Sequence, residues 1–138
     1  MRFDIFATGQ YRENYGAHDW NGEGACPQYW KSKGGASVLV TADVGLEQLT
    51  EARTAAEARV ATGELNESSD YSTSDYYGVV LFPAGANSDL RFLIENEVSM
   101  RDAPMFITRR DWQETFNQYR EWVRYFGLEE RVGLSDDE

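Results

Sequence analysis

The sequence predicts an α+β protein with a small, mainly antiparallel sheet and two helices. Residues 2–8 alternate apolar side chains, while 36–42 and 76–82 are rich in β-branched and aromatic residues, so all three indicate strands. Residues 46–62 and 108–126 have the composition or the period of helices. Strands interrupted by helices in this order are typical of a sheet with helices on one face.

The first two strands are expected to form a hairpin. Phe3, Ile5 and Ala7 share one face of the first strand, and the second strand begins after a pair of glycines. If the chain between residues 8 and 35 returns directly, the two strands pair antiparallel. The intervening segment then lies at one end of the sheet.

The first predicted helix, 46–62, is rich in alanine, leucine, glutamate and arginine. Asp43 or Thr41 is the predicted N-cap, and Gly63 is the predicted end. Its apolar stripe is thin, which suggests close packing of alanines on the sheet.

The C-terminal helix, at about 108–126, has the clearest pattern in the chain. Thr108 is the predicted N-cap, and Gly127 ends the helix. Apolar residues follow at spacings of four, three, four and three, so they form one stripe that we expect to pack on the sheet. The stripe consists of Trp112, Phe116, Tyr119, Val123 and Phe126.

Residues 90–98 fit two structures. Asn87 or Ser88 would cap a short helix, whereas the alternation of Phe92 and Ile94 fits a strand. We favour the strand. Residues 105–107 are predicted as a further short strand, and the polar, acidic segment 64–75 as a flexible loop.

The composition indicates one folded domain over residues 1–134, followed by an acidic tail at 135–138. The single cysteine cannot form an intrachain disulfide, and no apolar stretch resembles a signal peptide or a membrane span. A cytoplasmic location is therefore predicted. No cofactor is expected, and the sequence contains no Walker phosphate loop. It also lacks the GxSxG elbow that presents a serine nucleophile.

The net charge of −11 is unevenly distributed. Residues 1–35 are neutral overall, whereas 36–100 hold eleven acids against three arginines. Such a field repels nucleic acid and anionic membranes and attracts basic partners. Solubility or a salt-adapted source would also explain the excess and would give it no functional meaning.

The segment 8–35 contains both lysines, the only histidine, the only cysteine and two of the four tryptophans. A Gly-rich segment of this composition is typical of a loop that presents a surface for recognition. Three interpretations remain open: a protein-binding surface rich in Tyr and Trp, a base-stacking surface, and aromatics folded inward as a small core. The candidate anchors are Tyr15, Trp20, Tyr29 and Trp30.

The same segment offers an alternative ligand, metal or catalytic site. Its histidine and neighbouring aspartate resemble a general base with an orienting group, and its cysteine is a potential nucleophile. Residues 19–24 also match the first positions of a calcium loop, but Trp30 stands where the bidentate glutamate belongs, which excludes an EF-hand. The candidate residues are His18, Asp19, Glu23 and Cys26.

The segment YRENYGAHDW followed by CPQYWKSKGG resembles a stretch of small bacteriophage-type proteins of unassigned activity. The resemblance covers about a fifth of the chain and implies no catalytic residue. It implies a viral origin, and small acidic phage proteins are often inhibitors of host nucleic-acid enzymes.

We therefore expect an interaction protein rather than an enzyme. It would bind a basic host protein, as a DNA mimic does, with carboxylates in place of phosphates. The candidate carboxylates are Glu64, Glu67, Asp70 and Asp75. The other hypotheses are an enzyme or ligand-binding protein with its site in 8–35, and a protein that self-associates through its aromatic surface.

Overall fold

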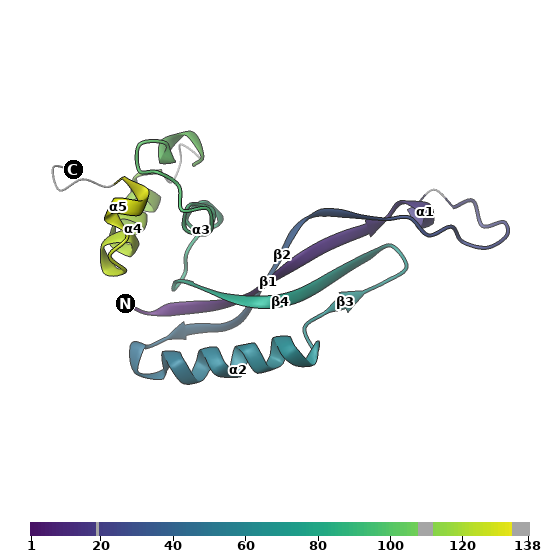
Figure 1. Ribbon diagram of the computed structural model, residues 1–138, viewed down its shortest axis with the longest axis horizontal. Helices are drawn as coiled ribbons and strands as arrows, with labels where there is room; N and C mark the ends of the chain where they lie inside the picture. Colours follow the sequence, from purple (N-terminus) through teal and green to yellow (C-terminus); the bar gives the residue numbers. More distant parts are fainter. Residues whose placement is uncertain (19, 108–111, 134–138) are drawn as a thin grey trace. The chain divides into compact units, whose positions relative to one another are not determined.

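The computed structural model describes residues 1–18, 20–107 and 112–133 and has the predicted α+β class. Its four antiparallel strands form a curled, half-barrel sheet in the order β2-β1-β4-β3 (Figure 1). The strands are β1 (Phe3–Asn14), β2 (Trp30–Val44), β3 (Glu67–Ser68) and β4 (Ser72–Pro83).

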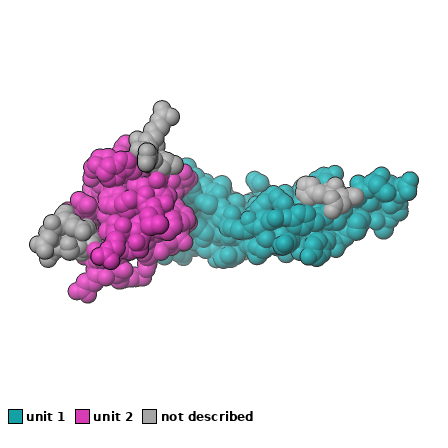
Figure 2. Space-filling model, turned by 90° about the horizontal axis from the view of Figure 1, so that it is seen from above, with its two compact units in different colours: residues 1–81 teal, residues 82–138 magenta. Residues whose placement is uncertain are grey.

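The contacts within the chain divide it into two compact units, residues 1–81 and 82–138, which Figure 2 shows in separate colours. Each unit has a buried hydrophobic cluster of its own. The prediction of one folding domain over 1–134 stays a prediction, because a division by contacts does not measure cooperative unfolding. The predicted tail at 135–138 lies outside the described residues.

The predicted hairpin is confirmed, and its strands are longer than expected. β1 and β2 pair antiparallel, with Phe6 opposite Leu39 and Thr8 opposite Ser37. The pairing continues to Asn14 and Trp30, so it takes up both ends of the segment that the sequence assigns to a loop. Three register shifts interrupt the ladder. Such irregularities increase the local twist of a strand, which fits the curl of this sheet.

The first helix is confirmed in position but not in its cap. The helix α2 (Leu49–Thr62) follows a 3₁₀ turn at Leu46–Gln48 and ends at Gly63, whose φ of 76° is left-handed. Neither segment has a side-chain cap. Asp43 lies in β2 and pairs with Arg2 at 2.6 Å, so it is not available as a cap.

The helix α2 packs on the sheet through a narrow stripe (Figure 1). Ala56 is its one buried residue. The buried cluster comprises Ile5, Val44 and Ala56, with Val40, Leu49, Ala52, Val79 and Leu81 packed against it.

The predicted loop at 64–75 is wrong for part of its length. Residues 67–68 form β3, and 72–75 already belong to β4. Glu67 and Ser68 are both exposed, at the edge of the sheet. A short edge strand with two exposed residues has no apolar alternation, and therefore its sequence resembles a loop.

The strand predicted at 90–98 is also wrong, and the helical alternative is correct. The helix α3 (Ser88–Glu95) begins with Asn87, whose side-chain oxygen accepts a hydrogen bond from the Leu90 amide at 2.8 Å. Leu90 and Leu93 are buried at helical spacing. The strand predicted at 105–107 is also wrong. Met105 ends a 3₁₀ helix, η2 (Ala103–Met105), which contains Pro104, and residues 106–107 form a turn and a bend.

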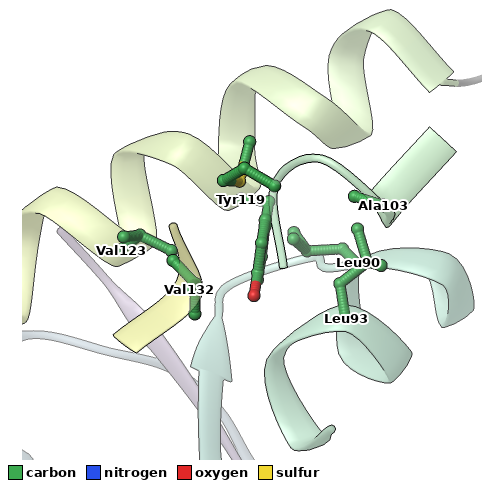
Figure 3. Close-up of a cluster of buried hydrophobic side chains, with 7 residues drawn as sticks. Leu90, Leu93, Ala103, Tyr119, Val123 and Val132 are labelled. Carbon is green, nitrogen blue, oxygen red and sulfur yellow. The ribbon is translucent and has the colours of Figure 1, made fainter. Parts of the chain in front are cut away.

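The C-terminal helix is confirmed as α4 (Trp112–Tyr125), and a short helix α5 (Glu129–Val132), which the sequence analysis missed, follows it. The predicted cap at Thr108 lies outside the described residues. Tyr119 and Val123 pack against α3, α5 and η2 (Figure 3). We expected this stripe to pack on the sheet; the buried cluster that contains Tyr119 and Val123 is formed within the second unit. The ends of the stripe, Trp112 and Phe126, are exposed.

The buried Tyr119 predicts a loss of stability at alkaline pH. Its hydroxyl donates a hydrogen bond to the Val98 carbonyl at 2.7 Å, and burial, aided by the nearby charge of Glu97, raises its pKa from 10.0 to about 12. The folded state thus favours the neutral phenol, so this stabilisation is complete below pH 10 and disappears as the pH rises through 12. At about pH 11 the free energy of unfolding should have fallen by roughly 1 kcal/mol through this group.

Urea unfolding measured between about pH 8 and 11 tests this prediction. Tyr119→Phe should remove the part of the alkaline decline that this phenol causes, whereas Tyr77→Phe, at an exposed position, should leave the decline unchanged. Equal declines in the wild type and Tyr119→Phe would contradict it.

Candidate functional site

The candidate site is the distal end of the β1–β2 hairpin, which we call the hairpin tip: residues 14–30 without the undescribed residue 19 (Figure 1, right). It contains one short helix, α1 (Tyr15–His18). The turn between β3 and β4 meets it, because the Asn14 amide donates a hydrogen bond to the Tyr71 carbonyl at 2.8 Å. Segments more than 50 residues apart in the sequence therefore meet at this end of the sheet.

The side chain of Asn14 holds the tip together. It is fully buried and forms four hydrogen bonds, three within the tip and one to the β3–β4 turn. Its oxygen accepts hydrogen bonds from the amides of Ala17 (3.2 Å) and Tyr29 (3.0 Å). Its nitrogen donates to the side-chain oxygen of Gln28 and the carbonyl of Asp70, both at 3.1 Å. One side chain thus joins α1, the returning chain and the β3–β4 turn.

Close backbone packing completes the base of the tip. The Tyr15 amide donates a hydrogen bond to the Tyr29 carbonyl at 2.8 Å. A Cβ atom at Gly16 would lie 2.3 Å from the Pro27 carbonyl oxygen, so only glycine fits there. The base of the tip is therefore closely packed.

Two of the four predicted aromatic anchors are well exposed. Trp20 is 42% exposed and Tyr29 62% exposed. The Trp20 indole donates a hydrogen bond to the Glu23 carbonyl at 3.1 Å, which fixes its edge. Tyr71 of the neighbouring turn, which the sequence analysis did not select, is 52% exposed and contributes a third aromatic ring at this end.

The other two anchors, Tyr15 and Trp30, are half-buried. The Tyr15 ring lies 6.3 Å from the ring of Tyr29 and 4.9 Å from the Lys33 ammonium. The Trp30 ring lies 5.9 Å from the Arg12 guanidinium. Both rings therefore contact other side chains at the base of the tip. Neither of the two described hydrophobic clusters includes an aromatic residue of the tip.

Two of the four predicted carboxylates form ion pairs with arginines. Asp75 lies 3.0 Å from Arg12, and Glu64 lies 3.3 Å from Arg59. These pairs are partly exposed, so each is weak, but each cancels a negative charge at short range.

The other two carboxylates, Glu67 and Asp70, are exposed. The Asp70 carbonyl accepts a hydrogen bond from the Asn14 side chain at the base of the tip. In the described part of the chain neither forms an ion pair. Asp70 directly precedes Tyr71, so an acidic and an aromatic side chain are adjacent in the same turn.

Of the four alternative site residues, the structure describes the side chains of Glu23 and Cys26. Glu23 is exposed, and its amide donates a hydrogen bond to the Asn21 side chain at 3.0 Å. The partly exposed Cys26 thiol points to the carbonyl of the next residue at 3.7 Å. Asp19 and the side chain of His18 lie outside what the structure describes, and no metal-binding group of three such side chains occurs among the described residues.

The segment with the calcium-like spacing contains two glycines in the left-handed region. Gly22 and Gly24 have φ angles of 87° and 70°, which favour glycine strongly. This supports the turn interpretation of Asn-Gly and Glu-Gly in that segment.

Comparison with known proteins adds no functional assignment. The chain matches no known protein family, no curated protein and no solved structure. The resemblance to phage-type proteins stays a prediction. In the described residues, no helix combines the length and the apolar character that crossing a bilayer requires.

Proposed function

We propose that this protein is an interaction module that binds a partner protein through the hairpin tip. The observation that carries the proposal is the exposure of Trp20, Tyr29 and Tyr71 at one end of the sheet, on a base held by the buried Asn14. Tyrosine and tryptophan dominate the energetics of protein interfaces. An ordered base reduces the entropy that a loop loses on binding.

The partner in this proposal has a basic surface. Glu67 and Asp70 are exposed, and Asp70 directly precedes Tyr71. The net charge of −11 attracts cations at longer range while it disfavours direct binding of nucleic acid. Mimicry of DNA towards a host enzyme, in the cytoplasm of the host cell, is the narrower form of the proposal. The pairing of Asp75 and Glu64 with arginines limits the carboxylate array available for it.

The test is affinity capture from a host lysate at about 50 and 500 mM salt, a range over which screening changes strongly. The double variant Trp20→Ala/Tyr29→Ala should weaken capture of the partner by roughly 10- to 100-fold, because each anchor is of hot-spot type. Glu67→Gln/Asp70→Asn should mainly reduce the sensitivity to salt.

Met105→Ala is the matched control, because Met105 is 80% exposed but belongs to the second unit. It should bind as the wild type does. A tip variant that is folded and captures the same partner with unchanged affinity would refute the proposal.

A further inference from the structure

A concave site lies between α2 and β4, away from the hairpin tip. It is an open cavity of about 360 Å³. It lies beside the narrow stripe of α2, where alanine replaces larger side chains. Its lining residues are Glu57, Val60, Ala61, Tyr76, Tyr77, Gly78 and Val79.

Three kinds of group line this cavity. Val60 and Val79 provide apolar walls, and Tyr77, which is 74% exposed, provides an aromatic ring. Glu57 provides a carboxylate, one of whose oxygens, Oε1, is paired with an arginine of the same helix. Its other oxygen, Oε2, has no hydrogen bond among the described residues.

We propose that this cavity binds the side chain of an arginine from an extended basic peptide. A guanidinium combines the three interactions that the lining offers: a bond to a carboxylate, stacking on an aromatic ring, and contact of its methylene stem with apolar walls. The cavity volume is at the lower end of the range for ligand sites, which suits one long side chain. The eleven acids against three arginines in residues 36–100 favour a basic ligand.

The protein's own Arg53 shows that Glu57 accepts a guanidinium. The Arg53 Nε lies 3.2 Å from Oε1 of Glu57, four residues further along α2. Both side chains are about half exposed, so this pair is weak and exchangeable. An incoming arginine therefore finds Oε2 without a hydrogen bond from any described residue and competes with Arg53 only for Oε1.

The experiment is an amide NMR titration of the full chain with a capped Gly-Arg-Gly peptide. Saturable shifts are expected at the amides of Val60, Ala61, Gly78 and Val79. The matched citrulline peptide, which has the same shape without the charge, should bind at least tenfold more weakly. The lysine peptide should also bind more weakly, because an ammonium cannot stack on a ring as a planar guanidinium does.

Substitutions on α2 distinguish binding of the peptide in this cavity from its non-specific attraction to the acidic surface. Ala61→Leu fills the cavity and should abolish the shifts, whereas Ala55→Leu, at an exposed position outside the lining, should leave them unchanged. Leucine is a good helix former, so both variants should fold. Arg53→Gln should strengthen binding severalfold, because it releases Glu57.

Two results would overturn the proposal. One is the absence of saturable shifts at the lining amides. The other is a set of shifts spread over the acidic surface, equal for arginine and lysine and unaffected by Ala61→Leu. The Trp20→Ala/Tyr29→Ala variant should bind the peptide normally, so the proposal for the cavity and the proposal for the hairpin tip can be refuted independently.

Discussion

Gly9→Ala is expected to destabilise the first unit by at least about 3 kcal/mol, or to prevent its folding. Gly9 is buried in β1, and the backbone of β4 lies directly against it at Asp75 and Tyr76. A Cβ atom there would lie 1.7 Å from the Asp75 carbonyl oxygen and 2.7 Å from the Tyr76 Cα. Both obstacles are backbone atoms, so no side-chain rotation relieves the overlap. The central pair of strands would have to separate.

Gly35→Ala is the matched control for this prediction. Gly35 lies on the neighbouring strand, opposite Gln10, and its nearest atom to an added Cβ is the Gly9 carbonyl oxygen at an ordinary 3.7 Å. Its change in the free energy of unfolding should stay within about 0.5 kcal/mol. Urea unfolding followed by tryptophan fluorescence measures both variants. Insoluble Gly9→Ala beside soluble Gly35→Ala would agree with the prediction, and equal stability of the two would contradict it.

The elements that the sequence predicts correctly are those with strong local signals. The alternation in residues 3–8 identifies β1, and Gly63 ends α2 because the chain needs a left-handed residue there. The stripe of α4 extends over four turns, which is long enough to distinguish a helix from a strand.

The errors occur where the local signal is short. In α3, the eight residues Ser88–Glu95 fit both periods, and the decisive feature is the cap at Asn87. In β3, pairing with β4 decides the structure, and the two exposed residues carry no pattern of their own. The apolar residues of α3 span too few turns to separate the two periods, and β3 contains no apolar residue.

The candidate site was predicted in part. The aromatic segment is indeed a hairpin end with exposed rings, but sequence alone does not separate the exposed Trp20 and Tyr29 from the half-buried Tyr15 and Trp30. Tyr71 was missed because it lies in a segment assigned to a polar loop. Asn14 was missed because its role depends on a carbonyl 56 positions away, at Asp70.

Asn14→Ala is expected to lower the free energy of unfolding by about 3 kcal/mol, and the loss of order should be greatest in the hairpin tip. The substitution removes four hydrogen bonds from a fully buried position. The amides of Ala17 and Tyr29 then lack an acceptor, and the carbonyl of Asp70 loses a donor. Leaving buried polar groups unpaired costs more than the bonds themselves contributed. Hydrogen exchange at the Ala17 and Tyr29 amides should accelerate more than exchange in α4.

Asn14→Asp and Asn21→Ala distinguish the parts of this effect. The aspartate keeps the acceptor for both amides but places an oxygen against the carbonyl of Asp70, so it should also destabilise the tip. Asn21 accepts one exposed hydrogen bond, from the Glu23 amide, and loss of this bond should change the free energy of unfolding by less than about 1 kcal/mol.

If the tip is the interface, Asn14→Ala should also weaken partner capture, although the Asn14 side chain is buried, because the aromatic rings lose their fixed base. Normal hydrogen exchange at the Tyr29 amide in Asn14→Ala would show that the tip is held by other contacts.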